Sequence, residues 1–293
     1  MDRLIKNIDK QIEFNKGKNI FLDEPALFKF IDDTVNAISN LDSLDYNSET
    51  ILIDYATDKA LGEFCRVNQY YSFNSESKLE LRSIYIDLFA SIRQKKSLPG
   101  SISTAHYQRL KDWLLKYNSF AGKVYAKAEP IVETVPCSEY SPKLQLEILH
   151  IDANCLLSTV LDVGCGKQAK LVNYLEQQGI EVYGIDRFPF ASGNLQTADW
   201  LEYDYGIRKW GTIISHLGFS NHFKHHNLRD DGDYIGYAKA FMNILNSLKV
   251  GGSFHYAPNL PFIEKYLDPV QYLLAEYEIE GSDFKSTVVK KLK

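Results

Sequence analysis

The sequence predicts an α/β domain with a doubly wound parallel sheet, preceded by an all-α domain. Apolar residues recur at helical spacing through the first 130 residues. From residue 131 onward, short apolar runs alternate with helical patterns, as in a sheet whose parallel strands are joined by helices. A glycine-rich turn at 164–166 lies between one such run and the next helical pattern. We therefore assign residues 1–130 to a helical domain and 131–293 to an α/β domain.

Composition restricts the class of protein. Hydrophobic residues are 45% and charged residues 24% of the chain, which is typical of a globular protein. No stretch without Asp, Glu, Lys or Arg is longer than 14 residues, which is too short for a membrane-spanning helix, and one stretch of that length, residues 250–263, contains two prolines. The charged N-terminus does not resemble a secretory signal, so we expect a cytoplasmic protein. The cysteines form no CxxC pair, and we expect free thiols and no metal site.

The net charge of −5 belongs to the second part of the chain. Residues 1–130 contain 18 Lys and Arg against 18 Asp and Glu, which leaves 15 against 20 in residues 131–293. Proteins that bind nucleic acids normally present a basic patch or stripe. We therefore expect a small-molecule substrate, with no nucleic-acid or membrane partner.

The helical domain is expected to contain helices near residues 24–38, 48–71, 77–97 and 103–117. Asp23 is the expected N-cap of the first, and Ser103 or Thr104 is expected to start the last. Aromatic side chains of this domain could form the wall of an apolar acceptor pocket, although core packing accounts for most of them. These are Tyr70, Tyr71, Phe73, Tyr107, Trp113, Tyr117 and Tyr125.

The α/β domain is expected to begin with a helix at 142–150. Buried strands are expected at 159–163, 181–186, 195–198, 211–215 and 253–257, with helices at 170–178 and 233–248. Two extended segments, 272–280 and 284–292, are joined by a short turn. They predict a hairpin that closes the sheet.

The segment Leu161-Asp162-Val163-Gly164-Cys165-Gly166 ends a predicted strand and leads into a helix. Its glycines allow a tight turn and a close approach to a ligand, while N–H groups at the helix start face anionic atoms. Asp186 follows at the end of the next strand, where a carboxylate accepts both hydroxyl hydrogens of a ribose. Together these features indicate a nucleotide-type site.

Two cofactor classes fit this pattern. Gly164, Gly166 and Ala169 satisfy the dinucleotide pattern GxGxxG/A. However, a carboxylate at position 162 would repel a pyrophosphate, whereas it would attract the α-ammonium group of S-adenosylmethionine. The closing hairpin also favours a seven-stranded methyltransferase sheet over a six-stranded dinucleotide fold.

Residues from about 140 to 293 resemble the class I S-adenosylmethionine-dependent methyltransferases. The family pattern of an acidic residue followed by GxG matches Asp162, Gly164 and Gly166. The resemblance implies that Asp162 holds the methionine ammonium, and that the turn, including the Cys165 backbone, lines the cofactor. It further implies ribose recognition by Asp186, with Arg187 beside the adenine ring. Asp199 is implied to accept from the adenine amino group, with Trp200 alongside.

The acceptor side departs from one branch of the family. Members that methylate nucleobase amines or glutamine amides carry Asn or Asp, two prolines and an aromatic residue after the fourth strand, and this chain does not. The segment from His216 to Asp233 is instead rich in histidine and is expected to be a loop. His216 and His222 are the candidate general bases. Tyr140 could fold over the methionine end of the cofactor.

The sequence therefore predicts an enzyme that transfers a methyl group from S-adenosylmethionine to a small molecule. Two alternatives remain open: an NAD(P)-dependent oxidoreductase, and a non-catalytic protein that binds the cofactor and a partner. The helical domain is expected to serve as a lid, a substrate-shaping element or a surface for homodimer formation.

Overall fold

The structure is a computed structural model that describes residues 1–22, 27–39, 46–94, 99–125, 129–132, 134–135, 140–191 and 193–293. Contacts divide the chain into a helical unit, Met1–Cys137, and an α/β unit, Ser138–Lys293. The division does not fall at the predicted boundary after residue 130, because Ile131 and Val135 form β-bridges with the helical unit. Across the described ranges, no helix has both the length and the hydropathy required to cross a bilayer.

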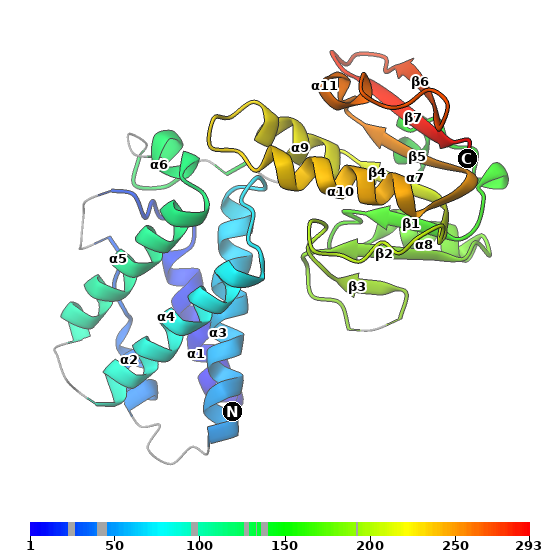
Figure 1. The fold of residues 1–293 in the computed structure, drawn as a ribbon. Helices are drawn as coiled ribbons and strands as arrows, with labels where there is room; N and C mark the ends of the chain where they lie inside the picture. Colours follow the sequence, from blue (N-terminus) through cyan, green and yellow to red (C-terminus); the bar gives the residue numbers. More distant parts are fainter. Residues whose placement is uncertain are drawn as a thin grey trace. The chain divides into compact units, whose positions relative to one another are not determined.

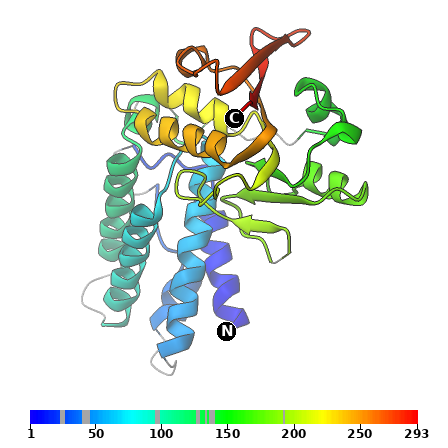
Figure 2. The same cartoon turned by 45° about the vertical axis from the view of Figure 1, so that its right-hand side comes forward.

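The helical unit is built from six helices in the described residues. They are α1 (Asp2–Asn15), α2 (Asp32–Ser39), α3 (Tyr46–Val67), α4 (Ser75–Arg93), α5 (Pro99–Tyr117) and α6 (Phe120–Tyr125). Helices α1 and α3 lie side by side (Figure 1; Figure 2). The inward faces of the helices share one core, in which Leu81, Trp113 and Leu114 are fully buried. The apolar spacing of the sequence therefore serves mainly for packing.

Two helix starts in this unit differ from the prediction. Helix α2 begins at Asp32, because the Gln11 side chain of α1 hydrogen-bonds the backbone of Lys29 and Ile31 and holds that segment out of a helix. The predicted cap, Asp23, lies outside the described residues. Helix α5 begins at Pro99 and not at residue 103 or 104. Proline suits this position because the first N–H of a helix has no partner within the helix.

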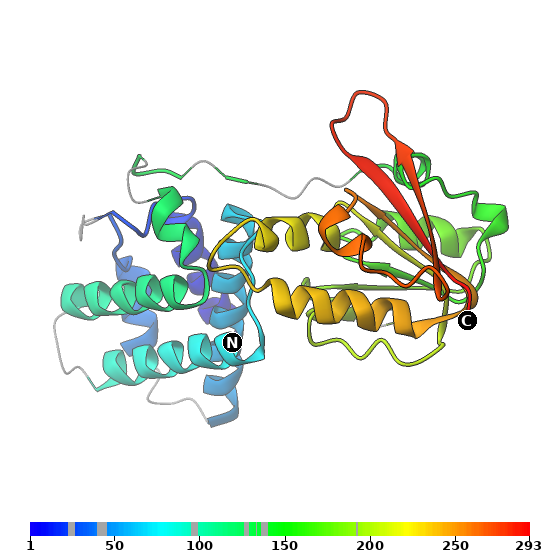
Figure 3. The ribbon, with the colours of Figure 1, turned by 45° about the horizontal axis from the view of Figure 1, so that its top comes forward.

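The α/β unit contains a seven-stranded sheet in the order β3-β2-β1-β4-β5-β7-β6. Its strands are β1 (Val160–Val163), β2 (Val182–Asp186), β3 (Leu195–Thr197), β4 (Trp210–His216), β5 (Leu248–Ala257), β6 (Tyr272–Glu278) and β7 (Lys285–Lys291). The first five strands are parallel, and β7 runs antiparallel to both β5 and β6 in the closing hairpin (Figure 3). This arrangement confirms the predicted doubly wound α/β class and the predicted seven-stranded sheet closed by a hairpin.

Helices cover both faces of the sheet. Successive residues of β1 point to opposite faces, as the pleat requires. Val160 packs with the core of α7 (Pro142–Ile148) and α8 (Lys170–Gln177). Leu161 packs with the core of α9 (Phe219–Asn227) and α10 (Tyr234–Ser247), and the short helix α11 (Pro261–Glu264) follows β5. The carboxyl ends of β1, β2 and β4 thus emerge together between two helical layers.

The prediction of a histidine-rich loop from residue 216 to 233 is wrong for residues 219–227, which form helix α9. Phe219, His222, Phe223 and His226 are all buried on one side of this helix. Because two of these four side chains are histidines, the sequence shows too few apolar residues at helical spacing to predict a helix here. Helix α9 is stabilised by its contacts with the core of the α/β unit.

Candidate cofactor site

The turn after β1 adopts the conformation that its glycines permit. Gly164 and Gly166 have φ angles of +83° and +77°, a region that side chains with a Cβ rarely adopt. The N–H groups of Gly164 and Cys165 donate to the Ile185 carbonyl at 2.9 and 3.2 Å. The Gly166 N–H donates to Asp186 Oδ2 at 2.9 Å. The turn is therefore fastened to the end of β2, and its own N–H groups are already used.

Asp162 is a buried carboxyl without a hydrogen-bond partner among the described residues. Its side chain lies in β1 beside Gly184 of β2 and is only 2% exposed. Burial, and secondarily the nearby Asp186 carboxylate, raise the pKa of Asp162 to about 8. Burying a charge is unfavourable unless it is paired. A cation brought to this position would relieve that cost.

Two other buried ionisable side chains of the α/β unit, Glu264 and Lys291, have hydrogen-bond partners within the fold. Glu264 Oε1 accepts hydrogen bonds from the Tyr256 hydroxyl at 2.6 Å and the Leu260 N–H at 2.7 Å. Lys291 Nζ donates to the Leu245 and Asn246 carbonyls. Because these groups are satisfied within the fold, they have no need of a ligand. Asp162 differs from both.

Asp186 lies at the end of β2 and shares this edge of the sheet. Burial raises the pKa of its carboxyl, while backbone hydrogen bonds from Gly166, Arg187 and Phe188 and the charge of Arg187 oppose that rise. The carboxyl is thus held in a defined orientation by main-chain donors. Such a carboxylate can accept hydrogen bonds from a pair of vicinal hydroxyls.

Asp199 and Trp200 follow β3. Asp199 Oδ1 accepts the Leu201 N–H at 2.9 Å, which fixes the carboxyl in a short turn. The Trp200 ring lies against the glycine turn, since a Cβ placed on Gly164 would be 3.0 Å from Trp200 Cζ3. The indole N–H donates to the Tyr237 hydroxyl at 3.4 Å. Trp200 therefore forms a wall beside the turn.

His216 ends β4, and its ring contacts the Tyr140 ring edge-on at a centroid distance of 4.9 Å. Its Nε2 atom is buried and has no partner among the described residues. Burial lowers the pKa of His216 to about 4, so the imidazole is neutral at pH 7. Ser215, by contrast, is fully buried, donates to the Val163 carbonyl and accepts the Phe219 N–H.

His222 lies in α9 and is only 5% exposed. Its ring contacts Trp200 edge-on at 5.0 Å, and its Nδ1 lies 3.5 Å from the Tyr237 hydroxyl. Burial and the nearby Arg187 hold the pKa of His222 well below its usual value. Sequence reasoning missed Tyr237, because its helical spacing with Phe241 in α10 indicates only core packing.

The remaining histidines of α9 are engaged elsewhere. His226 Nδ1 accepts the Asp233 N–H at 3.0 Å, and His225 lies 3.2 Å from an Arg229 nitrogen. In the described part of the chain, no group of three or more His, Cys, Asp or Glu side chains is arranged to hold a metal ion. Cys65, Cys155 and Cys165 are not in disulfide bonds, and Cys137 lies outside the described residues.

Three solved structures illustrate what the chain is similar to. A TehB-like SAM-dependent methyltransferase from Corynebacterium glutamicum is 18% identical, with 62% of this chain and 97% of that chain covered and a TM-score of 0.39. An rRNA methylase from Streptococcus thermophilus is 13% identical, with coverage of 54% and 99% and a TM-score of 0.36. The N-methyltransferase NodS from Bradyrhizobium japonicum is 12% identical, with coverage of 52% and 92% and a TM-score of 0.35.

No family model and no curated protein matches the chain. At the identities and TM-scores given above, the likeness to solved structures carries no conclusion about function. The chemistry of the site therefore rests on the residues that the sheet brings together. These are Asp162, the turn at 164–166, Asp186, Arg187 and Trp200.

Proposed function

We propose that the α/β unit binds S-adenosylmethionine at the carboxyl ends of β1 and β2 and transfers its methyl group to a small acceptor. The observation that carries this proposal is the buried Asp162 carboxyl, which has no hydrogen-bond partner among the described residues, beside Asp186 and the glycine turn. The α-ammonium group of the cofactor supplies the cation that Asp162 lacks. The ribose hydroxyls supply donors for Asp186.

The same features argue against a dinucleotide. The Gly164, Cys165 and Gly166 N–H groups already donate to β2, so they do not serve a pyrophosphate. The two buried carboxyls at this end of the sheet also supply neither the positive charge nor the N–H donors that a pyrophosphate requires. The NAD(P)-dependent alternative is therefore disfavoured by hydrogen bonding and by charge.

Other side chains complete the proposed site. Trp200 forms a wall beside the turn, and Arg187, which is next to Asp186, is proposed to lie beside the adenine ring. Asp199, whose Oδ1 accepts the Leu201 N–H, is proposed to accept a hydrogen bond from the adenine amino group. Tyr140 is proposed to cover the methionine end, from its position against His216.

When bound, S-adenosylmethionine supplies an electrophilic methyl group on a sulfonium centre. The protein contributes positioning of the acceptor and, where needed, proton removal. Of the two candidate bases, His216 is favoured because its Nε2 is unpaired, whereas His222 faces Tyr237 and Trp200. A neutral imidazole with a pKa of about 4 is a weak base, so His216 suits an acceptor that attacks without prior deprotonation and whose proton passes on to solvent.

The first experiment is calorimetric titration of the full chain with S-adenosylmethionine, S-adenosylhomocysteine and, separately, NADH. Asp186→Ala should weaken binding of both adenosyl ligands by at least about 100-fold, because each charge-assisted hydrogen bond contributes about 1.5–3 kcal/mol. Glu181→Gln, at the opposite end of β2, is the matched control and should bind as the wild type does.

The outcomes separate the alternatives. Binding of the adenosyl ligands alone supports the proposal, and formation of S-adenosylhomocysteine with a panel of small amines, alcohols and thiols then identifies the acceptor class. Binding of NADH alone would establish the dinucleotide alternative. Absence of binding to all three ligands would overturn the cofactor assignment.

A further inference from the structure

The helical unit contains a cavity of about 120 Å³ that the proposed methyl transfer does not use. Residues of α1, α3, α4 and α5 line it, and most of its surface is aliphatic or aromatic. Phe28, Phe30, Phe64, Tyr71 and Tyr107 supply rings to the wall. The cavity has about four-fifths of the volume of an apolar cavity of roughly 150 Å³ that accepts benzene, which limits a ligand to one small ring.

Two polar side chains in the lining have atoms without a partner among the described residues. They are Thr34 Oγ1 and His106 Nδ1, and both residues are only 5% exposed. The rest of the His106 ring is packed, with Phe30, Tyr85 and Tyr107 at centroid distances of 5.1–5.7 Å. Buried polar atoms in native proteins are rarely left unpaired. A ligand in the cavity would supply the missing hydrogen bonds.

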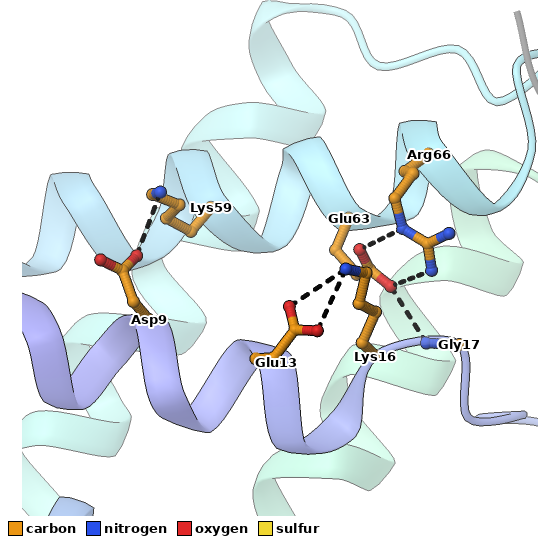
Figure 4. Close-up of polar contacts among 7 residues, drawn as sticks. All are labelled: Asp9, Glu13, Lys16, Gly17, Lys59, Glu63 and Arg66. Carbon is orange, nitrogen blue, oxygen red and sulfur yellow. Dashed lines mark hydrogen bonds and ion pairs between the residues drawn. The ribbon is translucent and has the colours of Figure 1, made fainter.

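The charged groups of the lining are already engaged. Glu63 accepts hydrogen bonds from the Gly17 N–H at 3.1 Å and from Arg66 at 2.7 Å (Figure 4). Lys18 Nζ donates to Asn15 Oδ1 at 3.1 Å and to the Leu27 carbonyl at 3.0 Å. Burial lowers the pKa of His106 to about 3, so its imidazole is neutral. Among the described residues, the lining therefore offers no unpaired charge to a charged ligand, and its two unpaired atoms suit an uncharged one.

We propose that this cavity binds a small neutral molecule with one ring and a hydroxyl group, such as a phenol or a cyclic alcohol. The ring contacts the aromatic wall, and the hydroxyl hydrogen-bonds His106 Nδ1, with Thr34 Oγ1 as the second polar contact. A hydroxyl both donates and accepts, so it fits either tautomer of a neutral imidazole. The site belongs to the helical unit alone and does not rest on the proposed cofactor chemistry.

The test is calorimetric titration of the full chain with p-cresol, toluene and benzylammonium. These probes share one ring and differ in a hydroxyl, a methyl and a charge. We expect p-cresol to bind about tenfold more tightly than toluene, which is the size of one net hydrogen bond, and benzylammonium not to bind. Failure of both neutral probes to bind would overturn the proposal.

Three variants locate the site. Ala60→Leu places a larger side chain in the cavity and should abolish binding of both neutral probes. His106→Leu should remove the preference for p-cresol while toluene still binds, and His106→Asn should restore part of it through an amide at the Nδ1 position. Unchanged p-cresol binding by Ala60→Leu, or an intact preference in His106→Leu, would contradict the assignment. Circular dichroism and thermal unfolding verify that each variant is folded.

Discussion

The α/β unit and the helical unit bury polar groups of different charge. In the described part of the helical unit, no Asp, Glu, Lys or Arg side chain is buried, and the unpaired atoms that line its cavity belong to a threonine and a neutral histidine. The α/β unit buries Asp162 and Asp186 together at one edge of its sheet. The difference matches the two ligands proposed above, which are neutral in the helical unit and cationic at the carboxyl end of the sheet.

The two units also tolerate unpaired groups at different cost. An unpaired neutral hydroxyl or imidazole costs about 1–3 kcal/mol, whereas a buried carboxylate changes its pKa instead of remaining charged. Asp162 shows this response, since its pKa is raised to about 8. The comparison can therefore be tested by removing each group and measuring stability and binding.

The largest effect is expected for Asp162→Asn in the ligand-free protein. Because the folded carboxyl has a raised pKa, wild-type stability is greatest below the unfolded pKa near 4 and is lost as pH rises towards about 8. At 1.36 kcal/mol per pKa unit, Asp162→Asn should be more stable than wild type at pH 8 by on the order of 2–5 kcal/mol. Urea unfolding of both proteins at pH 4 and pH 8 measures this difference. A difference in the free energy of unfolding that is the same at both pH values would contradict the prediction.

The next effect concerns the pH dependence of cofactor binding. Below pH 8 the free protein holds a proton on Asp162, and pairing with an ammonium group releases it. Affinity for S-adenosylmethionine should therefore rise up to about tenfold per pH unit between about pH 6 and 7.5, with release of close to one proton. Calorimetry in buffers of different ionisation enthalpy counts the proton. In Asp162→Asn, affinity should be weaker and nearly independent of pH.

A smaller effect is expected for Gly164→Ala in the turn. The φ of +83° and the approach to Trp200 at 3.0 Å both disfavour a Cβ, so we expect a loss of roughly 2–3 kcal/mol of stability. Gly179→Ala is the control, because Gly179 has a similar φ of +79° and no atom within 4 Å of the added Cβ. It should lose only about 1 kcal/mol. Equal losses in thermal unfolding would show that Trp200 does not confine the turn.

The smallest effect is expected for Thr34→Val in the helical unit. Removing an unpaired hydroxyl of similar shape should raise the free energy of unfolding by about 1 kcal/mol. Thr57→Val is the matched control, because Thr57 is also buried in a helix but donates to the Ile53 carbonyl at 2.8 Å. That substitution should destabilise by about 1 kcal/mol. If both substitutions changed the free energy of unfolding in the same direction, the conclusion that the Thr34 hydroxyl is unpaired would be wrong.

The amino-acid sequence by itself determined the succession of strands in the α/β unit, most of its helices and the residues of the glycine turn. Confirmed elements include β1, β2, α8 and the closing hairpin. These features depend on periodicity, caps and φ preferences, which act over a few neighbouring residues.

Only the tertiary structure decided which buried groups are paired. Glu264 and Asp162 are both buried carboxyls, yet Tyr256 and Leu260 satisfy one of them and nothing in the described chain satisfies the other. Helix α9, the start of α2 and the place of Tyr237 likewise depend on partners far away in the sequence. Such contacts cannot be read from local patterns, because hydrogen bonding and burial join residues that folding alone brings together.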